Sequence, residues 1–488
     1  MFLNSIFRFI IYFILQFVTI VEMTSATILD NSDLNIIDTY GCLNDKQFDV
    51  NNKTKKFKYV ILEESDIIDN QIIYDNTIYE IKYDFNLEKR TISVPQDCVL
   101  FFNGGKLLNG KLVGNETNIQ ANIHNHIFDN VTMSGTFVNS EFYVDWFGAS
   151  PGLKDNSNAI KEAINNAIPL RMPIRFNRGN YYVEKTIIVR NSYFLRLKGS
   201  NTSIRATFKQ NIGVADDIAI TGGSINLKSI PAVFAFIDCD YLVMDDFIIN
   251  GGKTGTYTNN GIVIAGCSNM TFSNLYIENV ISGILVYSMW MSNLKKIVCH
   301  NAINGFYYTS NRKNEKSGVT GTSNHFDNCW VNIATNAYVF DWLNYSTMTC
   351  CGADHVSVAY KFTGGTYVTM NGCASENCKS IFLWSNRSNV VANACQFMQY
   401  KGKQASVVLY NKSIVTITNS SFDNATFSCN NNNSIVNFLD CKVPNGNKNI
   451  WFTDEGGEYY IKEGNVNRYI SYKKGKRIEN IIDYNILR

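Results

Sequence analysis

A column of polar side chains recurs through the middle of the chain at a spacing that could support proton transfer. Its members follow one another at nearly regular intervals, and the shortest interval occurs three times: Asn250, Glu278, His300, Asn332, Asp354 and Glu376. If each interval is one turn of a coil, these side chains stack into a single stripe. Carboxylates beside an imidazole are the residue types that enzymes use for general acid–base catalysis.

Two of the three pairs at that shortest interval consist of ionisable residues. Asp354 and Glu376 would lie about 5 Å apart, one strand spacing, and two such carboxylates can share a proton, hold a cation or act as acid and nucleophile. Glu278 and His300 would form an acid–imidazole pair, with Tyr307 as a further candidate base. The predicted catalytic residues are therefore Glu278, His300, Tyr307, Asp354 and Glu376. Asp354 and Glu376 are also the predicted metal ligands, with Ca²⁺ as the possible cofactor.

The same column has a purely structural interpretation. Asn and acidic side chains at a corner of a coil can form hydrogen bonds with the backbone of the turn. Stacked from rung to rung, they would then form a structural ladder that has no catalytic role. The sequence leaves both interpretations open.

Two insertions enlarge a candidate groove. Residues 251–260 follow the polar column directly, and residues 310–318 carry Arg312 and Lys313. These two cations could bind a carboxylate or sulfate of a sugar, because guanidinium and ammonium groups pair well with such anions. An exposed loop tip of mixed charge is the alternative.

Three further side chains lie close to the second insertion in the sequence. His325 is on the strand that leaves it, and Trp330 is an aromatic candidate for stacking on a sugar. Trp342 is assigned to the core by its alternation. The predicted substrate-binding residues are Arg312, Lys313, His325 and Trp330.

A regular repeat between about residues 236 and 441 must position these groups. It is anchored on Phe247, Leu275, Ile297, Cys329, Cys351, Cys373, Cys395, Ser420 and Cys441. Three positions before each anchor, every residue is apolar: Met244, Phe272, Leu294, Phe326, Met348, Met370, Ala392, Ile417 and Phe438. Apolar residues at fixed offsets on short segments are typical of strands with period-two alternation. The repeat therefore predicts an all-β solenoid, a parallel β-helix of about 22 residues per rung.

Four anchors form a cysteine ladder, Cys329, Cys351, Cys373 and Cys395. Strand spacing is wider than the Cβ separation that a disulfide prefers, so we expect buried free thiols that act as small apolar side chains. Disulfide pairing between neighbouring rungs is the alternative. Because the 13 cysteines of the chain do not gather in Cys-x-x-Cys pairs, the sequence does not indicate a zinc site.

The segment before the repeat resembles the opening of β-helices of the pectate-lyase superfamily. The resemblance rests on Asp-Trp-Phe-Gly-Ala-Ser at 145–150, a predicted helix over 155–167 that stops at Pro169, a short strand at 173–176 and Gly-Asn-Tyr-Tyr-Val at 179–183. The rungs that begin at Cys351 and Cys373 are similar to those of tailspike-like members. The resemblance implies a right-handed, single-stranded parallel β-helix with one short capping α-helix.

It also implies a protein that acts on polysaccharides. The first expectation is a lyase that cleaves an acidic, uronate-containing glycan such as pectin or a glycosaminoglycan by β-elimination, with His300 or Tyr307 as base and Arg312 or His325 on the uronate. A glycoside hydrolase that uses the paired carboxylates is the runner-up, although the usual set of close Asp residues of polygalacturonases is not found. A non-catalytic, tailspike-like adhesin is the third possibility. We expect a monomer rather than a trimer.

The remaining divisions of the chain follow from composition. Residues 1–26 contain one arginine, an apolar run and a small-residue end, which predicts a cleaved signal peptide, with a hydrophobic anchor as alternative. Residues 27–78 are poorly patterned, 79–143 predict a small β-rich N-terminal entry module, 144–444 the β-helix and 445–488 a capping segment. We expect no membrane span after cleavage, and a secreted, periplasmic or cell-surface location in a bacterial source.

The overall charge excludes one class of partner. The formal net charge is +2 and only 18% of residues are charged. A nucleic-acid-binding protein would carry a clustered excess of Lys and Arg, so we expect no nucleic-acid partner.

Overall fold

The computed structural model of the protein describes residues 48–50, 53–55, 57–64, 68–210, 217–220, 223–309, 320–399, 405–422, 425–430, 434–439, 441, 457–463, 466–473 and 476–483. The chain divides into two compact units, residues 1–56 and 57–488. In the first unit, β1 (Phe48–Val50) and β2 (Lys53–Lys55) pair antiparallel. The predicted signal peptide, 1–26, lies outside the described residues. Among the helices that the structure does describe, none has the length and apolar character needed to cross a membrane.

The second unit begins with seven strands that pair in parallel over similar intervals along the chain, for example Lys58 with Thr77 and Phe85 with Leu107. Solenoid-like pairing therefore starts well before residue 144, on both sides of the predicted module boundary, which itself stays a prediction. The elements are β3 (Lys58–Ile61), η1 (Ile68–Asn70), β4 (Thr77–Ile81), β5 (Phe85–Asn86), β6 (Thr91–Ser93), β7 (Val99–Phe102), β8 (Leu107–Gln120) and β9 (Phe128–Phe137).

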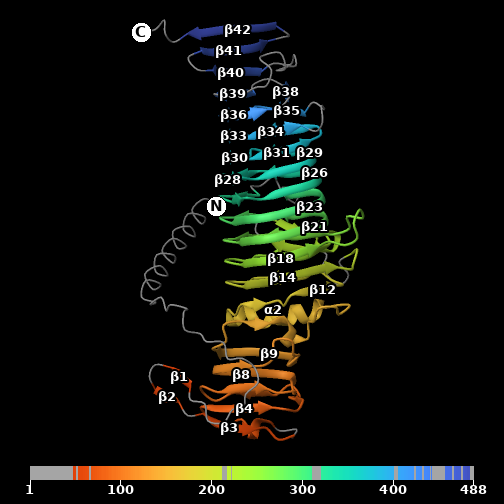
Figure 1. The fold of residues 1–488 in the computed structure, drawn as a ribbon, viewed down its shortest axis with the longest axis vertical. Helices are drawn as coiled ribbons and strands as arrows, with labels where there is room; N and C mark the ends of the chain where they lie inside the picture. The colour runs from red at the N-terminus through yellow and green to blue at the C-terminus, as the bar shows by residue number, and fades with distance from the viewer. Residues whose placement is uncertain are drawn as a thin grey trace. The chain divides into compact units, whose positions relative to one another are not determined.

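A 27-stranded sheet follows, and its strands pair in parallel from β10 to β40. The predicted parallel β-helix is confirmed, and Figure 1 shows its strands stacked one above another. Its first half contains β10 (Phe142–Tyr143), η2 (Val144–Phe147), α2 (Ser157–Leu170), β11 (Ile174–Arg175), β12 (Gly179–Val183), β13 (Ile187–Arg190), β14 (Arg196–Ala206), β17 (Ala232–Ile237), β18 (Val243–Asn250), β19 (Asn260–Ala265), β21 (Thr271–Val286) and β23 (Asn293–Tyr308).

The second half contains shorter strands with the same pairing. They are β25 (His325–Asp327), β26 (Trp330–Asp341), β28 (Ser346–Thr349), β29 (Gly352–Thr363), β30 (Tyr367–Asn371), β31 (Ala374–Cys378), β32 (Ile381–Asn386), β33 (Asn389–Asn393), β34 (Gln396–Gln399), β35 (Ala405–Tyr410), β36 (Ile414–Thr418), β37 (Ser421–Phe422), β38 (Ala425–Asn430) and β39 (Ile435–Leu439).

Smaller elements complete the coil. A separate parallel sheet joins β20 (Cys267–Ser268), β22 (Met289–Trp290), β24 (Gly321–Thr322) and β27 (Leu343–Asn344), and the insertion after β14 carries β15 (Ile218–Ile220), β16 (Gly223–Ile225) and η3 (Leu227–Ser229). At the C-terminal end, β40 (Gly457–Glu463) pairs in parallel with β39. β41 (Val466–Lys473) and β42 (Lys476–Asp483) then continue the sheet antiparallel.

Single residues in the left-handed backbone region turn the chain within each rung. One column of them precedes the anchor residues: Asp246, Asn274, Lys296, Asn328, Cys350 and Ala394, all with φ between 51° and 62°. A second column follows the polar stripe: Asn279, Asn301, Ile333, His355 and Asn377. Each turn redirects the strand, so that the segments on its two sides belong to different faces of the coil.

The interior is built from the apolar columns that the sequence predicted. Phe326 pairs in register with Met348, Met348 with Met370, and Met370 with Ala392, and all four side chains are fully buried. The predicted register is therefore confirmed. Such stacks bury apolar area continuously from rung to rung, which is the main stabilising contribution in a solenoid.

The cysteine ladder is a column of free, buried thiols, as predicted. Each thiol donates to a carbonyl oxygen of the preceding rung, at 3.4 Å from Cys329 to Leu294 and 3.5 Å from Cys351 to Phe326. Burial raises the pKa of the Cys329 thiol well above its usual value. The side chains act as small apolar residues with a weak hydrogen bond.

The predicted helix is present as α2, but it begins at Ser157 and ends at Leu170 rather than spanning 155–167. The Asp155 carboxylate accepts hydrogen bonds from the N–H and hydroxyl of Ser157, so Asp155 stays in the turn before the helix. Pro169 lies in the last turn, and Arg171 closes the helix with φ 51°. One face of the helix is apolar and buried: Ile160, Ala163, Ile164 and Ala167.

Candidate functional site

The predicted polar column exists as a stripe of side chains in register. β18 places Asn250 beside Glu278 of β21, and the pairing continues from Glu278 to His300, His300 to Asn332, Asn332 to Asp354 and Asp354 to Glu376. Asn250 is buried and the other five are half-buried. The stripe lies on the outer side of the sheet, because the alternating residues Ile277, Cys299 and Ala353 point into the core.

A second column runs beside the stripe, two residues earlier on each strand. Side chains two apart on a strand share a face, so Ile248, Tyr276, Val298, Trp330, Gly352 and Ala374 lie on the same outer surface as the stripe. We name the surface formed by these two columns, from residue 248 to residue 376, the stripe face. It combines two aromatic rings with three carboxylates and an imidazole.

Contacts within the stripe face hold several of its groups in place. Asn250 donates from Nδ2 to Oε1 of Glu278 at 2.7 Å. The rings of Tyr276 and His300 stack with their centroids 6.2 Å apart. Burial, and the negative charge of Glu278, raise the pKa of Tyr276, so its hydroxyl keeps its proton at neutral pH.

Asp354 is held mainly by the turn beside it. Its Oδ1 lies 2.8 Å from Nδ1 of His355 and accepts from Nδ2 of Asn377 at 2.9 Å. His355 and Asn377 both belong to the left-handed column that follows the stripe. These contacts support a turn-ladder role for Asp354, whereas Glu278 and His300 make no such contacts with their own turns among the described residues.

The carboxylate pair gives limited support for a metal site. Nowhere in the described part of the chain do three His, Cys, Asp or Glu side chains gather in a group that could hold a metal ion. Ca²⁺ takes six to eight oxygen ligands, and Asp354 and Glu376 supply only part of such a set. The remaining oxygens would have to come from water or substrate, and Ca²⁺ stays a prediction.

The first insertion folds along one side of the stripe face. Tyr257 donates from its hydroxyl to Oδ1 of Asn301 at 2.6 Å, and Asn301 donates in turn to Asn279 at 2.7 Å. Asn259 donates to the carbonyl of Phe208, which belongs to the insertion after β14. The insertion at residues 251–260 therefore contacts the start of the insertion that follows β14. Arg312 and Lys313 lie outside the described residues.

Two predicted site residues lie on other faces. Tyr307 is in register with Leu285 and Val339 and packs against a separate outer apolar cluster. His325 is on β25, before the left-handed residue Asn328, and its Nδ1 lies 2.6 Å from Oγ1 of Thr347. Of the nine predicted site residues, the structure thus brings together Glu278, His300, Trp330, Asp354 and Glu376.

The assignment of Trp342 to the core was wrong. Trp342 is half-buried and has φ 60°, so it occupies a left-handed turn rather than a strand position. Alternation counted through that turn therefore gave the wrong face. Leu343, the next residue, is the buried one.

Comparisons with solved structures agree with the fold. A tailspike (gp42) of an Acinetobacter phage matches with a TM-score of 0.55 at 15% identity, over 71% of this chain and 65% of the tailspike, so the chain spans less than two thirds of that protein. ORF18 of Geobacillus virus E2 matches with a TM-score of 0.42 at 16% identity, over 70% and 68% of the two chains. The catalytic unit of an α-1,3-glucanase from Streptomyces thermodiastaticus gives 0.33 at 12% identity, over 68% and 69%. At 15% identity the likeness to the Acinetobacter phage tailspike shows the fold alone. No family profile matches the chain, and no curated protein gives a significant match.

The stripe continues below the rungs that the sequence repeat revealed. β12 pairs with β14 and β14 with β18, which places Tyr182 beside Arg205 and Arg205 beside Asn250. Sequence reasoning missed this extension, because an insertion separates β14 from β18 and the register shifts between Lys198 and Thr202. The long interval between Arg205 and Asn250 hid the repeat.

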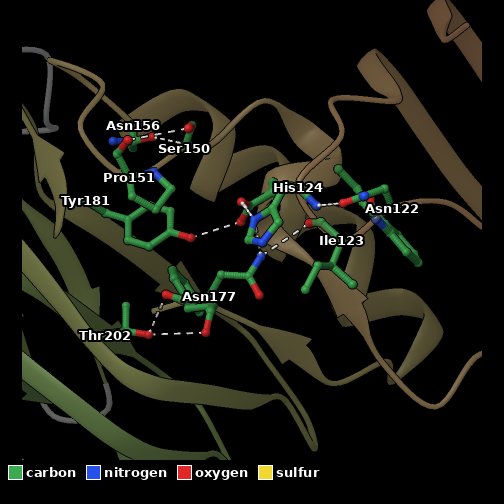
Figure 2. Close-up of polar contacts among 12 residues, drawn as sticks. Asn122, Ile123, His124, Ser150, Pro151, Asn156, Asn177, Tyr181 and Thr202 are labelled. Atoms are coloured by element: carbon green, nitrogen blue, oxygen red, sulfur yellow. Dashed lines mark hydrogen bonds and ion pairs between the residues drawn. The ribbon is translucent and has the colours of Figure 1, made fainter. Parts of the chain in front are cut away.

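A polar cluster supports the strand at the base of the stripe (Figure 2). Asp145 is buried, and its Oδ2 accepts from the hydroxyl of Tyr181 at 2.9 Å, while its Oδ1 lies 3.4 Å from Nδ1 of His124. Asn177 donates from Nδ2 to the carbonyl of Ile123 at 3.2 Å. Burial, together with Asp145, raises the pKa of Tyr181 well above its usual value, so its hydroxyl stays a donor.

The sequence carried only a weak signal for this cluster. His124, Asp145 and Tyr181 are separated by unequal intervals, and no repeat links them. Asp145 was visible only as part of the Asp-Trp-Phe-Gly-Ala-Ser segment. The cluster ties the β8–β9 connection, η2 and β12 together, and so fixes β12 beneath the stripe face.

Proposed function

We propose that the chain binds a polysaccharide along the stripe face and cleaves it. The observation that carries this proposal is the placement of Tyr276 and Trp330 among Glu278, His300 and Glu376 on consecutive rungs of one rigid outer sheet. Aromatic rings stack on sugar rings, and carboxylates bind hydroxyls. The rungs are about 4.8 Å apart, which is close to the length of one sugar residue, so a linear glycan parallel to the coil axis meets one rung per sugar.

The proposed reaction is β-elimination on a uronate-containing glycan. His300 takes the proton from C5 of the uronate, the electron pair forms the C4–C5 double bond, and the C4–O bond breaks. Glu278, in register with His300, stabilises the imidazolium that forms. Tyr276, one rung before His300, carries a protonated hydroxyl at neutral pH and supplies its proton to the leaving oxygen.

Hydrolysis is the second candidate reaction, and the register of Asp354 with Glu376 favours it. Retaining glycosidases place their two carboxyl groups about 5 to 5.5 Å apart, close to one rung spacing. The contacts of Asp354 with His355 and Asn377 weigh against it, because a general acid must be free to present its proton to the glycosidic oxygen.

Non-catalytic binding would use the same surface. The protein with the similar fold is a phage tailspike. A tailspike-like adhesin would need the stripe face but not its proton-transfer groups. An extracellular location, predicted from residues 1–26, would give the protein access to such a target, and the expectation of a monomer stays a prediction.

The experiment is a panel of acidic and neutral polysaccharides tested with the full chain for three readouts: ultraviolet absorbance of unsaturated uronate, new reducing ends, and binding. A lyase gives the absorbance together with reducing ends, whereas a hydrolase gives reducing ends alone. Binding without either product contradicts the enzymatic part of the proposal and leaves an adhesin. If the full chain gives no absorbance change, no new reducing ends and no binding with any polysaccharide of the panel, the proposal as a whole is contradicted.

A further inference from the structure

We propose that Arg205, two rungs below Glu278, forms an anion-binding subsite for a carboxylate of the glycan. This inference rests on the proposed function and names the part of the stripe face that selects an acidic substrate. It concerns binding rather than bond cleavage, and it involves no residue of the proposed proton-transfer pair.

The register places Arg205 on the same outer column as the stripe. Tyr182, Arg205, Asn250 and Glu278 follow one another on β12, β14, β18 and β21. Two rung spacings separate Arg205 from Glu278, roughly 10 Å along the coil axis. A glycan that spans the stripe face therefore reaches Arg205 two sugar residues from the one that lies over Glu278.

The contacts of Arg205 orient its guanidinium without neutralising it. Nε donates to Oδ1 of Asn180 at 3.0 Å and to Oγ of Ser203 at 3.1 Å, and both acceptors are uncharged. Within the described residues Arg205 has no carboxylate partner. Arg175 shows the contrast, because Glu141 accepts from both its Nε and Nη2 at 3.0 Å. Arg205 is thus a half-buried cation whose terminal N–H groups can meet a carboxylate in a bidentate pair.

The support beneath Arg205 is rigid. Asn180 lies on β12, which starts at Gly179 against the ring of Pro151, where an added Cβ would come within 2.7 Å. The next residue, Tyr181, is fixed by its hydrogen bond to the buried Asp145 (Figure 2). A guanidinium held in advance loses little conformational entropy on binding, which strengthens its pairing with an anion.

The charges on the rest of the stripe face give Arg205 a specific role. Glu278, Asp354 and Glu376 repel a polyanion along the upper rungs, whereas Arg205 attracts it at the lower end. A uronate chain therefore gains most when one of its carboxylates lies at Arg205. This arrangement fixes the position of the chain along the face and sets which bond lies over Glu278 and His300.

The test compares binding of one polyuronate with binding of the same polymer after methyl esterification. The probe is polygalacturonate, alginate or hyaluronate, whichever the wild-type full chain binds. Arg205→Gln should weaken binding of the acidic polymer about tenfold or more, as expected for a lost charge-assisted hydrogen bond, and leave binding of the ester unchanged. Arg205→Lys should bind more tightly than Arg205→Gln but less tightly than the wild type, because lysine keeps the positive charge but cannot form the bidentate pair of a guanidinium.

The matched control is Lys295→Gln, which removes one positive charge from another face, where Lys295 pairs with Asp327 at 3.7 Å. It should not alter binding of either polymer. The inference is overturned if Arg205→Gln binds the polyuronate as the wild type does, or if it loses affinity equally for the ester. If the wild type binds none of the polyuronates, the proposed acidic substrate fails first, and the inference fails with it.

Discussion

The indole of Trp330 occupies the space beside Gly352, its register partner on the next rung, so that a Cβ on residue 352 would overlap the indole ring. The absence of a side chain at Gly352 thus creates the space in which the half-buried Trp330 lies on the outer sheet.

Gly352→Ala should displace Trp330 and weaken glycan binding several-fold. Crowding of this kind costs about 1–3 kcal/mol where the neighbour cannot move, but Trp330 is half-buried and can swing outward, so the loss of stability should fall at the low end. Affinity and thermal unfolding of the variant measure the two effects. Ala374→Gly, in the same column one rung further, is the control. Unchanged affinity in Gly352→Ala would show that Trp330 takes no part in binding.

Variants of the stripe separate catalysis from turn structure. Glu278→Gln and His300→Ala should each lower product formation about a hundredfold, the usual scale for a lost proton-transfer group, with little change in thermal stability. Glu376→Gln should do the same if hydrolysis uses the carboxylate pair, and should have a small effect if elimination uses Glu278 and His300. Early unfolding with full activity in these variants would instead identify the stripe as a structural ladder.

Tyr181→Phe should destabilise the protein by about 1–3 kcal/mol, because it leaves one oxygen of the buried Asp145 carboxylate without its donor. Denaturant unfolding measures the loss. Tyr182→Phe, whose side chain lies on the opposite face of the same strand, is the control and should have little effect. An equally stable Tyr181→Phe variant would mean that water replaces the phenol at Asp145.

Stability should fall at alkaline pH. Burial raises the pKa of Tyr338 and Tyr360 well above 10, and their hydroxyls donate to the carbonyls of Cys329 at 2.8 Å and Ala374 at 2.7 Å. Because the folded-state pKa exceeds the unfolded value, each phenol contributes full stability below pH 10 and loses it as the pH rises above that value. The expected slope is about 1.4 kcal/mol per pH unit for each buried tyrosine.

Unfolding free energies measured between neutral pH and pH 12 test this expectation. Tyr360→Phe should be less stable at neutral pH yet show a shallower alkaline slope. Tyr367→Phe, at an exposed tyrosine, should leave the slope unchanged. A slope that Tyr360→Phe does not alter would assign the alkaline loss to other groups.

Thiol labelling should distinguish the cysteine ladder from exposed cysteine. Cys350 is exposed and should react rapidly in the folded protein, whereas Cys329, Cys351 and Cys373 should react only on unfolding. Peptide mass mapping after a short exposure to an alkylating reagent measures this. Cys350→Ala is the control for the rapid reaction. Rapid labelling of Cys351 in the folded state would contradict the buried ladder.

The sequence predicts the coil wherever apolar and polar residues alternate along the strands and the rungs repeat without interruption. Phe326 and Met348 were placed correctly because an unbroken repeat interval and the alternation along each strand fix their register. Trp342 was misplaced because a left-handed turn breaks the alternation just there, and the turn uses no glycine that would reveal it. Arg205 was missed because an insertion lengthens its interval to the next rung.

The candidate site was predictable to the same extent as the register. The stripe from Asn250 to Glu376 follows from spacing alone, but which faces carry Tyr307 and His325 depends on turns whose geometry the residue types do not specify. The contacts of Asp145 depend on side chains that meet across different connections of the coil. Spacing within a repeat carries no information on such contacts.

The turn positions before the anchors accept Asp246, Asn274, Lys296, Asn328 and Cys350 alike, so no particular side chain is needed to close a rung. The segments that begin at Cys329, Cys351 and Cys373 are equal in length and stack on one another. A tandem duplication of one such segment in the gene would therefore add one complete rung, and the surface open to a polymer would grow by one sugar at a single genetic step.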